Sequence, residues 1–485
     1  MENRLELCHV VYHVLLNQIQ FGAYHWKDRL PTIEETSMQL HVSMDTVRSA
    51  YLRLKHEGII SLSKNVGARV KVNYNHLEME QCIQMFFASR KTAMLDLAYS
   101  MRPLFAKAQG IGLRYASSQT LKEIEQLSEQ KEAIPPYAML EHLNQKYSAL
   151  GNPLLMRLVW QTFMFLHDPF FSLNENLHYF DQTTDYLPEL LKHCQSDDES
   201  AVQLSINQSL IRLADALDQF YRTRITYPTP EKEIDFEWSS YKKSQQLRYS
   251  LAMDLLLSIS RGVYPAGSLL PSQIELAELH GVGVNTVRRA LELLSSIGAI
   301  KSAKYIGTRV LPFDQVTENS DFTKPVLQRR LLDMTESLQF LALSCHDVAL
   351  TTLNALDASA FQNIADELRA HKQRRRGEVL SYVVLSLIAD AAPYQAIRTI
   401  YKELLQQFFW AYALLGMNGS QHTVNAVYDP YFDDLIQMLE QKENLQFAAR
   451  LEQLIHYEFQ RTQNTLSKLN IPGADNILSF PANPA

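Results

Sequence analysis

The sequence predicts a mainly α-helical protein made of a duplicated unit, in which three helices and a β hairpin precede an all-α bundle. Its 485 residues, 46% of them hydrophobic and 20% charged, suffice for several domains and are too apolar for a disordered chain. Only 16 glycines and 18 prolines indicate few tight turns, as expected for helical domains. An internal repeat with an offset of 240 residues reveals the duplication.

The repeat aligns two segments without a gap over about 65 positions, which chance does not supply. The paired residues include glycines and prolines that end secondary-structure elements. The matched pairs include Gly22 with Gly262, Leu30-Pro31 with Leu270-Pro271, Thr46-Val47-Arg48 with Thr286-Val287-Arg288, Gly58 with Gly298, Gly67 with Gly307, and Arg69-Val70 with Arg309-Val310. We therefore predict one folded module twice, in residues 1–75 (the first module) and residues 241–312 (the second module).

The first helix of the module is predicted from its apolar spacing. Val11, Leu15 and Ile19 recur at four-residue intervals and so lie on one helical face. Gly22 follows that face in the first module and Gly262 in the second, where a glycine can end the helix.

The second helix is short and has a defined start. Thr32 in the first module and Ser272 in the second are predicted N-cap residues, because a glutamate three positions later completes a capping box. The helix ends near His41 in one copy and Gly281 in the other. A turn of a few residues then leads into a third helix, which makes the arrangement a helix-turn-helix.

The third helix and a two-stranded wing complete each module. Gly58 and Gly298 end the helix, and the hairpin that follows turns at Gly67 or Gly307, where the backbone can approach a phosphate closely. The helix face predicted to be buried carries Val47, Ala50 and Leu54 in the first module and Val287, Ala290 and Leu294 in the second.

Charge is distributed unevenly along the chain. The formal net charge of −7 first argues against a nucleic-acid partner, because phosphate binding needs local positive charge. Residues 1–75, however, hold nine Lys/Arg against seven Asp/Glu, and residues 241–312 hold nine against four. The remainder carries −14, so both modules are basic within an acidic chain.

Two segments carry a resemblance to a known family. LPTIEETSMQLHVSMDTVRSAYLRLKHEGII and LPSQIELAELHGVGVNTVRRALELLSSIGAI are similar to the winged-helix signature of the GntR (gluconate-repressor) family of bacterial transcription regulators. The resemblance implies tandem winged helix-turn-helix domains that bind double-stranded DNA. It implies a recognition helix in the major groove and a wing over the minor groove.

The remaining segments, 76–235 and 313–485, are predicted to be helical effector or dimerisation domains. Residues 147–158 resemble a segment of the FadR-type (fatty-acid-regulator) effector domain, and residues 387–397 resemble it more weakly. Many members of that branch bind a divalent metal through an Asp and several His. Leu143 and Leu385 stand where the first His is expected, so we predict no metal and no cofactor.

Two alternatives stay open for these helical domains. They either hold a small organic effector without a metal or serve only as structure. The isolated histidines there, His142, His167, His193 and His456, are interpreted as surface or hydrogen-bonded core residues. Whether two chains associate as a homodimer is also left open.

The candidate DNA-binding residues follow from the repeat. Arg48 and Arg288, beside helix N-termini that favour anions, are the predicted phosphate contacts. The other candidates are either DNA contacts or, alternatively, helix caps and solvated side chains of a hairpin. They are Thr32, Ser43, Thr46, Lys64, Gly67 and Arg69 in the first module, and Ser272, Asn285, Thr286, Arg289, Lys304, Tyr305, Gly307, Thr308 and Arg309 in the second.

Four positions depart from the family pattern. Where members commonly carry arginine, this chain has Glu34 and Met44 in the first module and Ile274 and Val284 in the second. Arginine bidentate to guanine is the commonest specific contact, so ordinary operator reading is in doubt. Met44 and Val284 are suited to touching thymine methyls, and Asp45 is expected to weaken phosphate affinity in the first module.

Three classes of function are compatible with a chain of this length. The favoured hypothesis is a cytoplasmic transcription regulator whose two unlike modules form an internal pseudo-dimer, and the alternative is a scaffold that has lost operator recognition. An enzyme is not predicted, because GxxxxGK[ST], HExxH, GxSxG and paired-cysteine motifs are missing. No segment is apolar over the length of a membrane span, so no membrane partner is expected.

Overall fold

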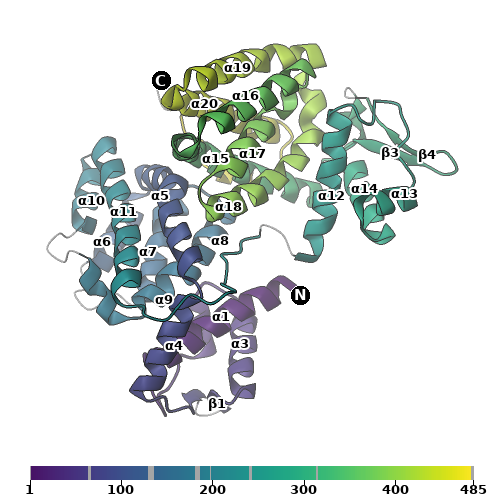
Figure 1. The fold of residues 1–485 in the computed structure, drawn as a ribbon. Coiled ribbons are helices and arrows are strands. Elements are labelled where there is room, and N and C mark those ends of the chain that lie inside the picture. The colour runs from purple at the N-terminus through teal and green to yellow at the C-terminus, as the bar shows by residue number, and fades with distance from the viewer. Residues whose placement is uncertain are drawn as a thin grey trace. The chain divides into compact units, whose positions relative to one another are not determined.

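The computed structural model describes residues 2–63, 67–128, 136–180, 186–196, 198–239, 243–312 and 315–481. They form two compact units (Figure 1). The first unit comprises Met1–Leu150 and Met156–Glu237, and the second comprises Gly151–Leu155 and Trp238–Ala485. The predicted four-domain division, with boundaries near residues 75, 240 and 312, stays a prediction.

The first unit contains a winged helix followed by a helical bundle, as predicted. The winged helix consists of α1 (Glu2–Gln20), α2 (Ile33–Gln39), α3 (Met44–His56), β1 (Ile60–Ser63) and β2 (Gly67–Val70). The bundle consists of α4 (His76–Ala88), α5 (Lys91–Arg114), α6 (Ser118–Ser128), α7 (Pro136–Ser148), α8 (Pro153–Thr162), the π-helical turn η1 (Phe163–His167), α9 (Asp168–Phe171), η2 (Asn174–Tyr179), α10 (Tyr186–Gln195) and α11 (Glu199–Thr223).

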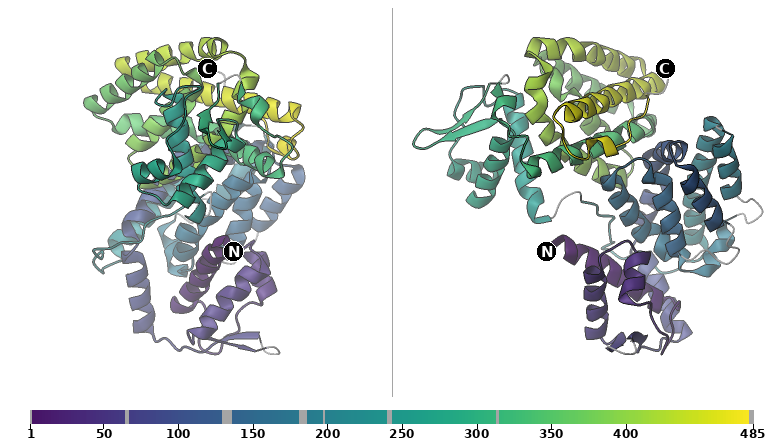
Figure 2. Two further views of the ribbon diagram at one scale, coloured as in Figure 1. Left: turned by 90° about the vertical axis from the view of Figure 1, so that its right-hand side faces the viewer. Right: turned by 180° about the vertical axis from the view of Figure 1, so that it is seen from behind.

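The second unit also contains a winged helix followed by a helical bundle (Figure 2). Its winged helix consists of α12 (Lys243–Ser260), α13 (Gln273–His280), α14 (Val284–Ser296), β3 (Ile300–Ala303) and β4 (Gly307–Val310). Its bundle consists of η4 (Thr317–Asn319), α15 (Pro325–Ala355), α16 (Ala358–Gln373), η5 (Gly377–Val379), α17 (Leu380–Ala391), α18 (Gln395–Leu405), η6 (Gln406–Asn418), α19 (Gln421–Gln441), α20 (Asn444–Lys468) and η7 (Ala474–Asn476).

The predicted capping boxes are present in both modules. Thr32 Oγ1 accepts from Glu35 N at 3.1 Å, while Thr32 N donates to a Glu35 carboxylate oxygen at 2.6 Å. Ser272 and Glu275 form the same pair at 3.3 and 2.7 Å. The polar start of each second helix is thereby fixed, and the turn toward α3 or α14 follows within a few residues.

The helix face predicted to be buried forms the core of each winged helix. Val47, Ala50 and Leu54 of α3 have no exposed surface, and the same holds for Val287, Ala290 and Leu294 of α14. Each wing is an antiparallel hairpin in the same register, with Ile60 opposite Val70 and Ile300 opposite Val310.

The core of the first module continues into its bundle. Trp160 of α8 and Phe163 of η1 pack in the same hydrophobic cluster as Leu54 and Val70. The Trp160 Nε1–H donates to the Leu40 carbonyl at 2.7 Å, at the end of α2. The helix-turn-helix is therefore anchored to the bundle from its buried side.

Gly151–Leu155 group with the second unit by their contacts. The predicted division, which includes them in the first helical domain, stays a prediction. The Asn152 side-chain amide donates to the Glu336 carbonyl at 2.8 Å, and Leu154 N donates to the Glu336 carboxylate at 2.9 Å. Helical periodicity cannot assign a segment this short to one core or the other.

Within the described part of the chain, no helix is both long enough and apolar enough to cross a membrane.

Candidate nucleic-acid interface

The side-chain hydroxyls of Ser43 and Thr46 lie together at the N-terminus of α3. Ser43 Oγ accepts from Thr46 N at 3.2 Å, and the two side-chain hydroxyls lie 2.8 Å apart. Thr46 is only 2% exposed, so the structure corrects its prediction as a surface contact. Ser43 is the N-cap of α3 and remains at the surface, while Thr46 lies buried in the first turn.

The exposed side of α3 carries a charge pair. Arg48 Nη1 lies 3.0 Å from Asp45 Oδ1, and both side chains are more than half exposed. An aspartate beside a helix N-terminus is itself favourable for the helix, because it faces the positive end of the helix dipole. It also offsets the charge of the arginine predicted to contact phosphate.

The equivalent side of α14 differs by one residue. Arg288 Nη2 donates to the amide oxygen of Asn285 at 2.9 Å, and Arg288 Nε lies 3.9 Å from a Glu292 carboxylate oxygen. Arg289 is exposed and makes no hydrogen bond or ion pair within the described ranges. The neutral amide holds the arginine without adding a negative charge, so the first turn of α14 lacks the acidic side chain that Asp45 places in the first turn of α3.

Arg69 in the wing of the first module is tied back to its own module. Its Nη1 donates to the Lys27 carbonyl at 2.8 Å, although the side chain remains exposed. Gly67 has a φ of 79°, the left-handed region that favours glycine. Lys64, also predicted to contact DNA, lies outside the described residues.

The wing of the second module has an exposed aromatic tip. Tyr305 is 94% exposed and has a φ of 68°, which is rare for a residue with a side chain. The Lys304 ammonium lies 5.0 Å from the Tyr305 ring centre, a cation–π distance. Thr308, predicted as a DNA contact, has its hydroxyl 3.0 Å from that of Ser302 across the hairpin.

Two basic residues of the first module escaped the sequence prediction. Arg29 forms an isolated β-bridge with Arg69, which brings it to the edge of the wing. Lys27 stacks its ammonium 3.9 Å from the centre of the Trp26 ring. The repeat could not reveal them, because Gly267 and Leu269 stand at the paired positions.

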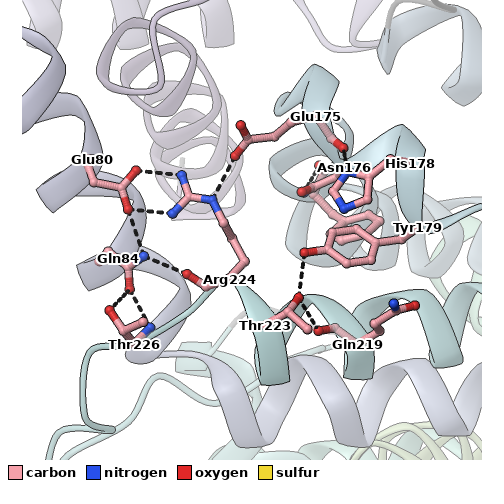
Figure 3. Close-up of polar contacts among 11 residues, drawn as sticks. Glu80, Gln84, Glu175, Asn176, His178, Tyr179, Gln219, Thr223, Arg224 and Thr226 are labelled. Atoms are coloured by element: carbon pink, nitrogen blue, oxygen red, sulfur yellow. Dashed lines mark hydrogen bonds and ion pairs between the residues drawn. The ribbon is translucent and has the colours of Figure 1, made fainter.

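A polar network fixes the helix that follows the first module (Figure 3). Arg224, after α11, binds both carboxylate oxygens of Glu80 in α4 at 2.5 Å, and its Nε donates to Glu175 at 2.9 Å. These bonds lower the pKa of Glu80 and raise the pKa of Arg224. Gln84 adds a bond to the Arg224 carbonyl at 2.8 Å, so α4 is held firmly against the bundle.

A pocket of about 620 Å³ opens beside this network. Its walls come from the end of α1, from α4, and from the segment around η2, with Phe21, Met79 and Phe171 as apolar lining and Arg224 as a cation. It touches the winged helix as well as the bundle.

Two histidines of the bundles, His167 and His456, pack against aromatic rings. His167 stacks on Phe163 with ring centres 5.5 Å apart, and burial lowers its pKa to about 4. His456 is 4% exposed and packs against Phe480 at 5.2 Å. Where side chains are described, no three His, Cys, Asp or Glu residues gather in a way that could hold a metal ion.

Comparison with known proteins addresses the two modules. The model of a family described as bacterial regulatory proteins, gntR family, matches residues 7–70 and 248–310. Both modules are therefore similar to gntR-family domains. The uncharacterized HTH-type transcriptional regulator YieP of Escherichia coli is 41% identical to this chain over 68 residues, 14% of this chain and 30% of YieP. The chain thus spans less than a third of the length of this relative.

Two solved structures are also similar to part of the chain. Streptococcus agalactiae GntR is 16% identical and aligns over 44% of this chain and 99% of its own, with a TM-score of 0.22. E. coli McbR/YncC is 18% identical and aligns over 44% of this chain and 98% of its own, with a TM-score of 0.23.

Proposed function

We propose that the chain is a transcriptional regulator whose two gntR-family domains bind double-stranded DNA. One observation carries the proposal: each module exposes an arginine, Arg48 or Arg288, at the same position of its recognition helix. The arginine stands one turn from the helix N-terminus, where free backbone amides and the helix dipole also favour phosphate.

The second module is proposed to bind more tightly. Its helix α14 adds Arg289, and its wing presents Lys304 and Arg309 on the exposed side. In the first module Asp45 offsets Arg48, and Arg69 is held by the Lys27 carbonyl. Phosphate contacts supply most of the non-specific affinity for DNA. The second module, which has more cations without an acidic partner, is therefore expected to bind DNA more tightly than the first.

Two unlike domains in one chain support an internal pseudo-dimer that reads unlike half-sites. Met44 and Asp45 open α3, whereas Val284 and Asn285 open α14. Identical domains read a palindrome, so domains that differ at their base-facing start are suited to an asymmetric site. The support for unlike half-sites is this difference in sequence between the two recognition helices.

The pocket beside Arg224 is the proposed place for a small organic effector. It touches the end of α1, which belongs to the winged helix, and the start of α4, which follows the winged helix in sequence. A ligand there would change contacts of both the winged helix and the bundle, which is what coupling between effector and DNA requires.

The test is DNA binding by the purified full chain to duplexes enriched from a random library. We expect affinity to fall steeply with salt, and Arg48→Ala and Arg288→Ala each to lower affinity and reduce the salt slope by about 1. Arg222→Ala is the matched control, because that arginine is exposed on α11 and pairs with Asp218. Unchanged affinity in both module variants would contradict the proposal and favour a scaffold.

A further inference from the structure

We propose, on the basis of the DNA binding proposed above, that both recognition helices select thymine through its methyl group. The residues are Met44 and Val284, which are the first residues of α3 and α14 and are separated by the repeat offset of 240. Thymine selection goes beyond the proposed function, which names duplex DNA as a partner but no base that is recognised.

Both side chains are exposed although they are apolar. Met44 is 53% exposed and Val284 is 44% exposed, while the opposite side of each helix is fully buried in the core. Residues four apart on a helix are neighbours, so Met44 lies beside Arg48, and Val284 beside Arg288. An arginine that contacts the phosphate backbone therefore has an apolar neighbour on the same face.

Polar groups next to these positions are already engaged. Asp45 binds Arg48 at 3.0 Å, and the amide oxygen of Asn285 accepts from Arg288 at 2.9 Å. A bidentate contact of asparagine with adenine would have to share that amide oxygen with the arginine. The first turn of each helix thus offers an apolar surface in place of a free hydrogen-bonding pair.

Thymine is the base that matches such a surface. It alone displays a methyl group in the major groove, and apolar side chains contact that methyl. Removing one methyl from water changes affinity by about threefold to fourfold. One such contact in each of two half-sites therefore favours thymine over a base without the methyl by about tenfold or more.

The experiment replaces single thymines by deoxyuridine, which lacks only the methyl group. A duplex enriched with the full chain is scanned in this way, and affinities are measured by fluorescence anisotropy. We expect wild type to lose about threefold at one or two thymines in each half-site. We expect Met44→Ala to abolish this loss in one half-site and Val284→Ala to abolish it in the other.

Two matched variants and the thermal midpoint serve as controls. Met38→Ala and Leu279→Ala truncate apolar side chains that are 63% and 67% exposed on α2 and α13, so they should keep full sensitivity to deoxyuridine. All four variants change exposed side chains and should unfold at the wild-type temperature.

The outcomes separate thymine selection from the proposed function. If the chain binds no duplex, the proposed function fails, and thymine selection fails with it. If it binds duplexes but deoxyuridine has no effect at any position, only thymine selection is overturned. Thymine selection is also overturned if Met44→Ala and Val284→Ala weaken thymine and deoxyuridine duplexes equally, because their apolar surface then serves a contact other than the methyl.

Discussion

Asp45 and Asn285 occupy equivalent positions in the two recognition helices and differ only in charge. Each contacts the arginine three residues later, at 3.0 Å in α3 and 2.9 Å in α14. The geometry of the arginine is therefore similar in both helices. What differs is one negative charge placed where the phosphate backbone is proposed to lie.

Exchanging these two residues tests that difference. We expect Asp45→Asn to raise DNA affinity and Asn285→Asp to lower it, each by about threefold to tenfold at low salt. The effects should shrink as salt rises, since screening reduces repulsion between exposed charges. Titrations of both variants at two salt concentrations measure this. Equal affinities for wild type and variants at low salt would show that neither side chain lies near phosphate.

Asp168 is a buried acid between the first module and its bundle. It is fully buried at the start of α9, beside Gln18 of α1, and burial raises its pKa to about 7 against a smaller opposing effect of Gln18. An acid with a raised folded-state pKa is favoured in its neutral form. The unfolded chain releases the proton from about pH 4 upward, so the folded state loses stability as pH rises from there toward 7.

We predict that Asp168→Asn removes this loss. The free energy of unfolding of the variant relative to wild type should rise between pH 4.5 and 7.5, by about 4 kcal/mol at most. Urea denaturation at the two pH values measures the change, and any constant cost of the substitution cancels in the comparison. Asp215→Asn, an exposed position in α11, is the control. A pH-independent difference would mean that Asp168 is charged in the folded state.

The turn from recognition helix to wing is built by a glycine in both modules, in different surroundings. Gly58 has a φ of 76° and Gly298 a φ of 69°, so both lie in the left-handed region. A Cβ at Gly58 would meet nothing within 4 Å, whereas a Cβ at Gly298 would lie 2.1 Å from the Val316 carbonyl oxygen. The second module thus packs its turn directly against the segment that follows its wing.

Alanine at the two glycines should therefore differ in cost. We expect Gly58→Ala to lower the free energy of unfolding by about 1 kcal/mol through backbone strain alone. Gly298→Ala adds a backbone clash and should cost at least about 3 kcal/mol. Chemical denaturation of both variants of the full chain decides this. Equal costs would show that the Val316 segment moves aside freely.

The sequence was sufficient for the elements of the modules, because local signals specify them. Capping boxes, apolar spacing and turn glycines predicted the helices and wings near their observed bounds. Contacts between distant residues were not predictable: the bond from Arg69 to the Lys27 carbonyl, the bridge of Arg29, and the burial of Thr46. Each depends on how one element packs on another, which no residue spacing encodes.

The modules and the bundles of the repeat differ in net charge, and the two modules differ from each other at their exposed positions. The two modules carry the positive balance of a chain whose net charge is −7, and the bundles carry the negative balance. Duplication followed by divergence explains why the scaffold residues of the modules match while their exposed positions do not. Core positions tolerate little change, whereas exposed positions can change without loss of fold.

This divergence predicts an asymmetric DNA site for the full chain. In a footprint on its enriched duplex, we expect two protected half-sites of unlike sequence. Arg48→Ala should weaken protection of one half and Arg288→Ala that of the other, because each arginine belongs to one recognition helix. The half that depends on Arg288 should remain protected at higher salt, since α14 also presents Arg289. A perfect palindrome in which both variants weaken both halves equally would contradict specialised modules, because equal halves require equivalent reading helices.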